Sequence, residues 1–172
     1  MEALEAIYTR RSIKGFTDKM PSQTDIDKIT KAGTAAPTGM GIQSPFIVVV
    51  KNKAIRDELS RMNAEVMGTH SDPFYNAPVI IVVLADKSRG TYINDGSLVM
   101  GNMLNAAHAI GLGACWIHRA KEVFESARGK ELLKEWGITE DVEGIGHIAL
   151  GYANVEPKPA KPRKNGYVRV IE

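Results

Sequence analysis

Several residue types are scarce in this chain, and each shortage excludes a class of protein. The 172 residues include one cysteine, Cys115, so no disulfide can form within the chain and a reducing compartment is expected. The histidines and Cys115 show no metal-ligand spacing, so we expect no metal site. Aromatic residues make up 6% of the chain, which leaves few rings for stacking nucleic-acid bases.

Long apolar segments are missing as well. The longest run, residues 77–85, is much shorter than the roughly 20 residues that span a bilayer. The first residues lack a basic stretch followed by an apolar one, so no signal peptide is expected. We therefore predict a cytoplasmic protein with no membrane partner. The length, with 44% hydrophobic and 24% charged residues, predicts a single globular domain over residues 1–172.

Glycine-rich nucleotide motifs are also absent. No G-x-G-x-x-G follows a predicted strand and there is no Walker A loop, which argues against a Rossmann or P-loop fold. Gly111-Leu112-Gly113 stands at the end of a helical pattern, where a helix stop explains it better. A phosphate group would therefore have to be bound by side chains.

What the sequence does contain is an alternation of helical and strand patterns. Helical spacing predicts helices over residues 4–8, 22–33, 53–67, 94–110 and, in one or two pieces around Gly129, 121–136. Apolar and β-branched runs predict strands over residues 46–50, 79–84, 114–117, 146–152 and 167–171. Residues 156–164 hold three prolines and are expected to form an extended loop. This interleaving indicates an α/β or α+β fold.

Two basic clusters lie near opposite ends of the chain. They comprise Arg10, Arg11, Ser12 and Lys14 after the first helix, and Lys161 and Arg163 in the proline-rich segment. A phosphate monoester carries nearly two negative charges and several acceptor oxygens, which such side chains can bind. The alternative is a solvated basic surface, or a module that binds phosphate or nucleic acid without catalysis. The net charge of +2 does not favour a nucleic-acid partner.

Five segments, in order, resemble the nitroreductase family of FMN-dependent oxidoreductases. They are residues 8–16, 35–46, 94–96, 111–116, and 149–152 with the Pro/Lys/Arg stretch that follows. The resemblance covers nearly the whole chain. It implies an α+β fold with a central mixed, mainly antiparallel sheet flanked by helices, built as an intertwined homodimer. The helix predicted over residues 94–110 is rich in small residues, and we expect it at the central interface.

The resemblance also implies which residues bind FMN. Contacts to the phosphate and ribityl chain are implied for Arg10, Arg11, Ser12, Lys161 and Arg163, and a contact to the pyrimidine edge of the flavin ring for Lys14. A loop from the partner subunit, containing Pro37, Thr38, Gly39 and Gln43, covers one ring face; its Gly39 suggests a close backbone approach and a positive φ. Gly41 departs from the family, which often has asparagine there.

The remaining implied contacts surround the reactive part of the ring. The backbone of Trp116, Ile117 and His118 is implied to lie beside flavin N5, and Asn63 resembles a pocket asparagine. His118 is the one histidine placed to exchange a proton near substrate, although family members commonly work without a catalytic acid, so no catalytic side chain is assigned.

The function implied is hydride transfer from NAD(P)H through flavin N5 to a nitroaromatic or quinone, in a ping-pong order. A second possibility keeps FMN but performs reductive dehalogenation, flavin breakdown or a biosynthetic oxidation. Such relatives usually carry an added lid, which this short chain lacks.

Overall fold

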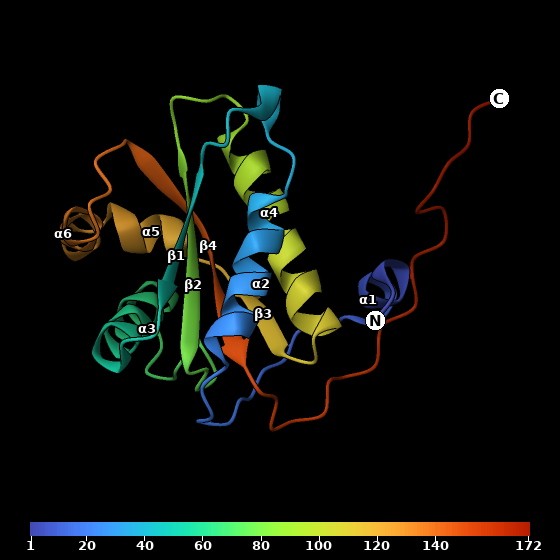
Figure 1. Cartoon of the computed structure of the whole chain (residues 1–172), viewed down its shortest axis with the longest axis horizontal. Coiled ribbons are helices and arrows are strands. Elements are labelled where there is room, and N and C mark those ends of the chain that lie inside the picture. Colours follow the sequence, from blue (N-terminus) through green and yellow to red (C-terminus); the bar gives the residue numbers. More distant parts are fainter.

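A four-stranded sheet forms the centre of the computed structural model, which describes residues 1–172 (Figure 1). Its strands are β1 (Pro45–Val50), β2 (Val79–Asp86), β3 (Gly113–Ile117) and β4 (Val142–Gly151). They lie in the order β1-β2-β4-β3, and every neighbouring pair is antiparallel. The isolated bridge between Ser12 and Ala114 is parallel. The α+β fold with a mixed, mainly antiparallel sheet is thus confirmed.

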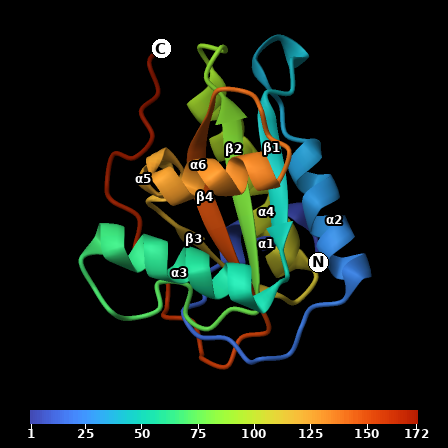
Figure 2. The ribbon, with the colours of Figure 1, turned by 90° about the vertical axis from the view of Figure 1, so that its left-hand side faces the viewer.

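Helices cover both faces of this sheet. They are α1 (Ala3–Thr9), α2 (Gln23–Thr34), α3 (Lys53–Met67), α4 (Tyr92–Ala109), α5 (Ala120–Glu125) and α6 (Ala127–Glu135), with a short 3-10 turn, η1 (Gly39–Gly41). Helices α2 and α4 pack on one face, and α3, α5 and α6 lie across the other (Figures 1 and 2). Helix α1 packs on α4, on the side away from the sheet. None of the helices combines the length and the hydrophobicity needed to cross a membrane.

Local capping explains where the helices begin and end. The Ser22 hydroxyl accepts a hydrogen bond from the Asp25 N–H at 3.1 Å and so caps the start of α2. Residues 121–136 form two helices, one of the two predicted alternatives, but the break comes at Ser126, which caps α6, and not at Gly129. Gly129 instead lies inside α6, where a Cβ atom would stand 2.1 Å from the Val123 carbonyl oxygen.

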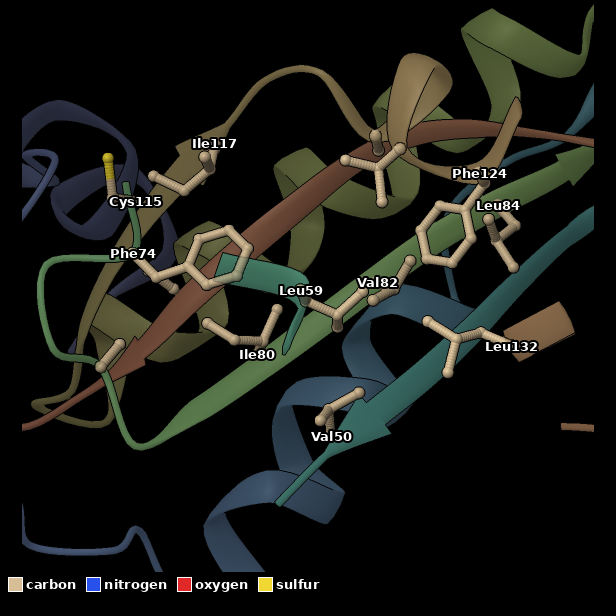
Figure 3. Close-up of a cluster of buried hydrophobic side chains, with 14 of the residues drawn as sticks. Val50, Leu59, Phe74, Ile80, Val82, Leu84, Cys115, Ile117, Phe124 and Leu132 are labelled. Atoms are coloured by element: carbon tan, nitrogen blue, oxygen red, sulfur yellow. The ribbon is translucent and has the colours of Figure 1, made fainter. Parts of the chain in front are cut away.

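Two apolar clusters pack against opposite faces of the sheet. Alternate residues of β2 serve both: Ile80, Val82 and Leu84 face α3, α5 and α6, whereas Val79, Ile81 and Val83 face α2 and α4. Phe74, Phe124 and Leu132 complete the first cluster (Figure 3). Because β2 is buried on both faces, it appears in the sequence as a continuous apolar run.

The strand predicted over residues 167–171 is wrong. Residues 154–172 contain no regular element, as expected for 156–164, and they run past α1 to a C-terminus away from the sheet (Figure 1). A strand forms only beside another strand that completes its hydrogen bonds, and no strand of this chain pairs with the tail. Its apolar side chains are consequently exposed, with Val168 at 79% and Ile171 at 91%.

Candidate functional site

The N-terminal basic segment is fixed along the start of β3. The Ile13 N–H donates to the Ala114 carbonyl at 3.1 Å, next to the bridge between Ser12 and Ala114. Ile13 is buried in the core, 8% exposed. Because side chains alternate along extended backbone, Ser12 and Lys14 point the other way and are exposed. The fold therefore presents a hydroxyl and an ammonium group on one side of the strand.

A cavity of about 410 Å³ opens beside this segment. Arg11, Ser12 and Lys14 line it together with residues 155–158 of the tail. Lys158 is a basic residue of this cavity that the sequence analysis missed, although it stands in the same Pro/Lys run as Lys161. None of the cavity's cations forms an ion pair with a carboxylate, although Glu156 is also in the lining.

The other predicted basic residues are placed differently. Lys161 and Arg163 lie farther along the exposed tail and do not line this cavity. Arg11 lines it but uses its guanidinium locally, donating from Nη1 to the carbonyls of Tyr8 at 3.0 Å and Arg10 at 2.8 Å. These are carbonyls at the C-terminal end of α1, which a cation stabilises. Arg10 is half-buried beside them.

The end of β3 is held by Asn63, which is fully buried on α3. Its Nδ2 donates to the His118 carbonyl at 2.8 Å, and its Oδ1 accepts from Arg119 Nε at 3.0 Å. Arg119 has a φ of 73°, an unfavourable conformation for a residue with a Cβ. Asn63 thereby fixes the chain where it leaves the sheet, next to the predicted contact residue His118.

The side chains at this strand exit point in different directions. Ile117 is buried in the cluster against α3 and α5, whereas Trp116 is half-buried on the α4 side. His118 is exposed and, with Trp116 and Arg119, lines a second cavity of about 270 Å³. The strand exit therefore adjoins open space large enough for a small molecule.

The loop over residues 37–43 is organised by Asp95 of α4, which is 4% exposed. Its carboxylate accepts hydrogen bonds from the Gly39 N–H at 3.0 Å and from the hydroxyls of Thr91 at 3.0 Å and Ser44 at 3.2 Å. A Cβ at Gly39 would lie 2.4 Å from Thr91 Oγ1, so close approach explains this glycine.

A positive φ was expected at Gly39, but the positive φ angles of this loop belong to other residues. They occur at Met40, Gly41 and Gln43, with values of 53°, 67° and 59°. Gly39 does not share this conformation, so that part of the prediction is wrong. Among the three, only Gly41 avoids the cost of a Cβ in the left-handed region. The glycine that replaces the family's frequent asparagine thus suits the backbone of this turn.

The loop and the basic segment lie near opposite ends of α4. Asp95 holds the loop near the first turn, whereas Thr9, just before the basic segment, bonds His108 near the last turn at 2.8 Å. His108 lies 13 residues after Asp95 in this helix, which corresponds to about 20 Å. In one chain the loop and the basic segment are therefore anchored about 20 Å apart along α4.

Two buried titratable groups lie next to β3 without facing the cavities. Burial raises the pKa of the Cys115 thiol, against weaker opposing effects of Ser12 and Lys14. Burial lowers the pKa of His147 to about 3, although backbone groups of His118 and Ile117 oppose the shift. The His147 ring packs against Phe74, and neither of its nitrogens has a hydrogen-bond partner. His147 is therefore a neutral core residue.

Comparison with known proteins agrees with this geometry. The family model described as the nitroreductase family matches residues 7–152. A protein of Archaeoglobus fulgidus, named as a candidate NADH dehydrogenase/NAD(P)H nitroreductase, is 34% identical over 162 residues, covering 90% of this chain and 87% of the relative.

Two solved structures, both nitroreductases with bound FMN, are also similar. The one from Bacteroides fragilis is 26% identical with a TM-score of 0.90, covering 100% of both chains. The one from Desulfitobacterium hafniense is 27% identical with a TM-score of 0.88, covering 99% of this chain and 100% of the other. With the family model matching most of its length, this chain belongs to the nitroreductase family.

Proposed function

We propose that this protein is an FMN-dependent oxidoreductase that takes hydride from NAD(P)H and passes electrons to nitroaromatic or quinone acceptors. The observation that carries the proposal is the cavity beside β3, where unpaired cations and the Ser12 hydroxyl face open space. The bound FMN in the B. fragilis and D. hafniense nitroreductases supports it, as does the NAD(P)H in the name of the A. fulgidus relative.

The residues of the cavity suit FMN chemically. Ser12 and Lys158 of the lining, with the neighbouring Arg10 outside it, offer charged and neutral donors of the kind that bind a phosphate dianion. Lys14 stands farther along the same strand edge and would meet the pyrimidine edge of the flavin. The main chain at Trp116 to His118, fixed by Asn63, would lie beside N5. When bound, FMN supplies the redox chemistry by accepting hydride at N5 and returning two electrons.

A second subunit would complete the site. The loop over residues 37–43 and the basic segment are anchored about 20 Å apart along α4, which favours a partner's loop as the cover for a flavin bound by this chain. In a two-fold homodimer the loop of each subunit would cover the flavin of the other, giving two equivalent sites. Lys161 and Arg163 could then also reach the phosphate from the tail.

Exposed apolar residues support this dimer. Leu4, Ile7 and Tyr8 form the apolar stripe of α1, yet they are 62%, 53% and 67% exposed, and Ala6 is the one buried residue of this helix. The tail exposes a second apolar group around Val168 and Ile171. Exposed large apolar side chains in such number are typical of an interface between subunits. The small-residue helix α4 would lie at the centre of that interface.

Transfer of hydride and electrons at the flavin would depend on how the protein orients the two substrates, more than on catalytic side chains. NAD(P)H and the acceptor would use the same exposed ring face in turn, which gives a ping-pong order. The protein would exclude water, and Trp116 and His118 would border the space that both substrates enter. The whole chain, residues 1–172, would act as one FMN-binding domain.

The test is an absorbance spectrum of the purified protein, followed by anaerobic titration with NADH or NADPH. We expect flavin bands that bleach with either or both nucleotides and return when nitrofurazone or menadione is added. A protein that stays colourless after incubation with excess FMN would refute the proposal.

A further inference from the structure

Lys14 lies over an aromatic ring instead of a carboxylate. Its Nζ atom is 5.8 Å from the centroid of the Tyr75 ring, within the range of a cation–π interaction. No hydrogen bond or ion pair joins Lys14 to any other side chain. The half-buried ring of Tyr75 is therefore the one group that restricts where this ammonium can lie.

Tyr75 itself stands in a strained turn. Its φ is 55° and that of Asn76 is 63°, so two successive residues with side chains occupy the left-handed region. This conformation is unfavourable for a bulky residue, and it persists only where the surroundings impose it. Strain of this kind is concentrated at functional sites, which motivates a search for what holds this turn.

The carboxylate of Asp72 holds the turn on both sides of Tyr75. It accepts hydrogen bonds from the main-chain N–H groups of Phe74 at 2.9 Å and Asn76 at 2.7 Å. Phe74 is fully buried in the apolar cluster of Figure 3. The backbone on either side of the tyrosine is thus anchored, one side by packing as well.

Asp72 is in turn held from α3. Ser60 Oγ donates to it at 2.7 Å, and Arg56 forms an ion pair with it through Nη2. Arg56 is only 8% exposed and also donates from Nε to the Ala77 carbonyl at 3.0 Å. Burial opposes ionisation of Asp72, but these hydrogen bonds outweigh it and hold its pKa below the ordinary value. The turn is therefore built on a charged, buried support.

We propose that Tyr75 is a positioning residue that fixes the Lys14 ammonium against the pyrimidine edge of FMN and thereby raises the reduction potential of the bound flavin. This inference rests on the proposed function, because it assigns Tyr75 to the same FMN site. A free lysine side chain samples many rotamers, so its charge acts at an average distance. The Tyr75 ring limits that sampling, and a cation held in one place stabilises developing negative charge more strongly.

The experiment measures the two-electron reduction potential of bound FMN in holoenzyme variants. Tyr75→Leu removes the ring, and we expect it to weaken binding of reduced relative to oxidised FMN by roughly tenfold, a potential lower by about 30 mV. Tyr75→Phe keeps the ring face and should retain the wild-type potential. Tyr152→Leu is the matched control, because it removes a similar pair with Lys19, whose Nζ lies 4.5 Å from the Tyr152 ring centroid, and should also leave the potential unchanged.

A double-mutant comparison tests whether Tyr75 acts through Lys14. In a Lys14→Met background, Tyr75→Leu should produce no further change in potential. The inference would be overturned if Lys14→Met lowers the reduction potential of bound FMN but Tyr75→Leu leaves it equal to that of the wild type. An equal shift with and without Lys14 would overturn it as well.

A measurement on the apoprotein is independent of these variants. The Hε protons of Lys14 should resonate upfield of those of Lys28, because the Tyr75 ring shields them; unshifted resonances would refute the contact. Failure of the proposed function would give a different result from failure of this inference. The protein would then bind no FMN at all, and this inference would fail together with the proposed function.

Discussion

The main-chain N–H of Gly39 donates to Asp95 Oδ1 at 3.0 Å, which joins two segments 56 residues apart. The bond connects the start of the longest helix to the loop that the family resemblance assigns to the partner's flavin. A single buried carboxylate thus determines the shape of a segment whose proposed function lies in the other subunit.

Replacement of Asp95 should loosen that loop. Asp95→Ala leaves the donors of Gly39, Ser44 and Thr91 without their acceptor, so we expect a loss of about 3 kcal/mol in urea denaturation. Asp95→Asn keeps one acceptor oxygen and should lose less, about 1 kcal/mol. Asp141→Ala is the control, because that side chain is 80% exposed and its surface pair with Lys87 adds little to stability. Equal stability of the Asp95 and Asp141 variants would contradict this account.

Lys14→Met should weaken FMN binding and lower its reduction potential. A cation at the pyrimidine edge stabilises the negative charge that reduction places there, so its loss disfavours the reduced form. A tenfold change in relative affinity corresponds to about 30 mV. The measurement is the potential by dye equilibration, with Lys28→Met on α2 as control. A protein still full of FMN at an unchanged potential would refute the role of Lys14.

Ile7→Glu should convert the proposed dimer to monomers. This side chain is 53% exposed on α1, and a buried charge at a subunit interface would be costly. Sedimentation velocity should show the halved mass, and FMN affinity should fall with it because each site needs both subunits. Lys28→Glu, a charge change on a side chain that is 59% exposed, should remain dimeric. A wild-type protein that is monomeric with full FMN affinity would exclude the dimeric site.

His147 should make stability depend on pH. Its pKa is about 3 in the folded protein and about 6.5 when unfolded, so between these values the unfolded state binds the extra proton. Stability should therefore fall as pH falls, by about 1.4 kcal/mol per pH unit between about pH 6 and about pH 4. Protonation of His108 acts in the same direction, because burial first and the nearby Arg10 and Arg11 second lower its pKa too.

The variant His147→Leu isolates the contribution of this histidine. Its unfolding free energy should depend less steeply on pH across that window than the wild-type value, whatever its absolute stability. His70→Gln, at an exposed position, should keep the wild-type slope. The slopes can be compared by urea denaturation at several pH values. Parallel curves for His147→Leu and the wild type would show that His147 does not titrate as the fold requires.

Much of the fold was predictable because it depends on local patterns. Helix α3 covers residues 53–67 as predicted, since Asn52 caps its start and Gly68 ends it in the left-handed conformation. Strand β4 begins at Val142, four residues before the predicted start at residue 146. The prediction missed this part of the strand because glycines interrupt its apolar pattern. Gly144 meets the Ala120 backbone and Gly146 meets Trp116 and Met100 at distances that exclude a Cβ. That reason lies in packing and is invisible in a local window.

The candidate site was predictable only in part. Arg10, Ser12 and Lys14 were predicted because charge and hydroxyl groups beside a helix end are evident in the sequence, as is the family resemblance of that segment. Ser12 and Lys14 line the cavity beside β3, whereas Arg10 does not. Tyr75 was missed because its neighbour in space is 61 residues away in the chain and its positive φ has no signal in the residue type. Asp95 was not predicted to hold the loop, because its three donors come from separate positions in the chain.

By itself the sequence determined the order of helices and strands, the family and the kind of ligand that the basic segment suits. Those properties follow from side-chain periodicity, capping and charge, which act over a few residues. Only the tertiary structure decided which carboxylate shapes the loop over residues 37–43, which ring lies beside Lys14 and that the loop and the basic segment are anchored near opposite ends of α4. The reason is physical: such contacts join residues distant in the chain, and their geometry exists only once the sheet and helices have packed.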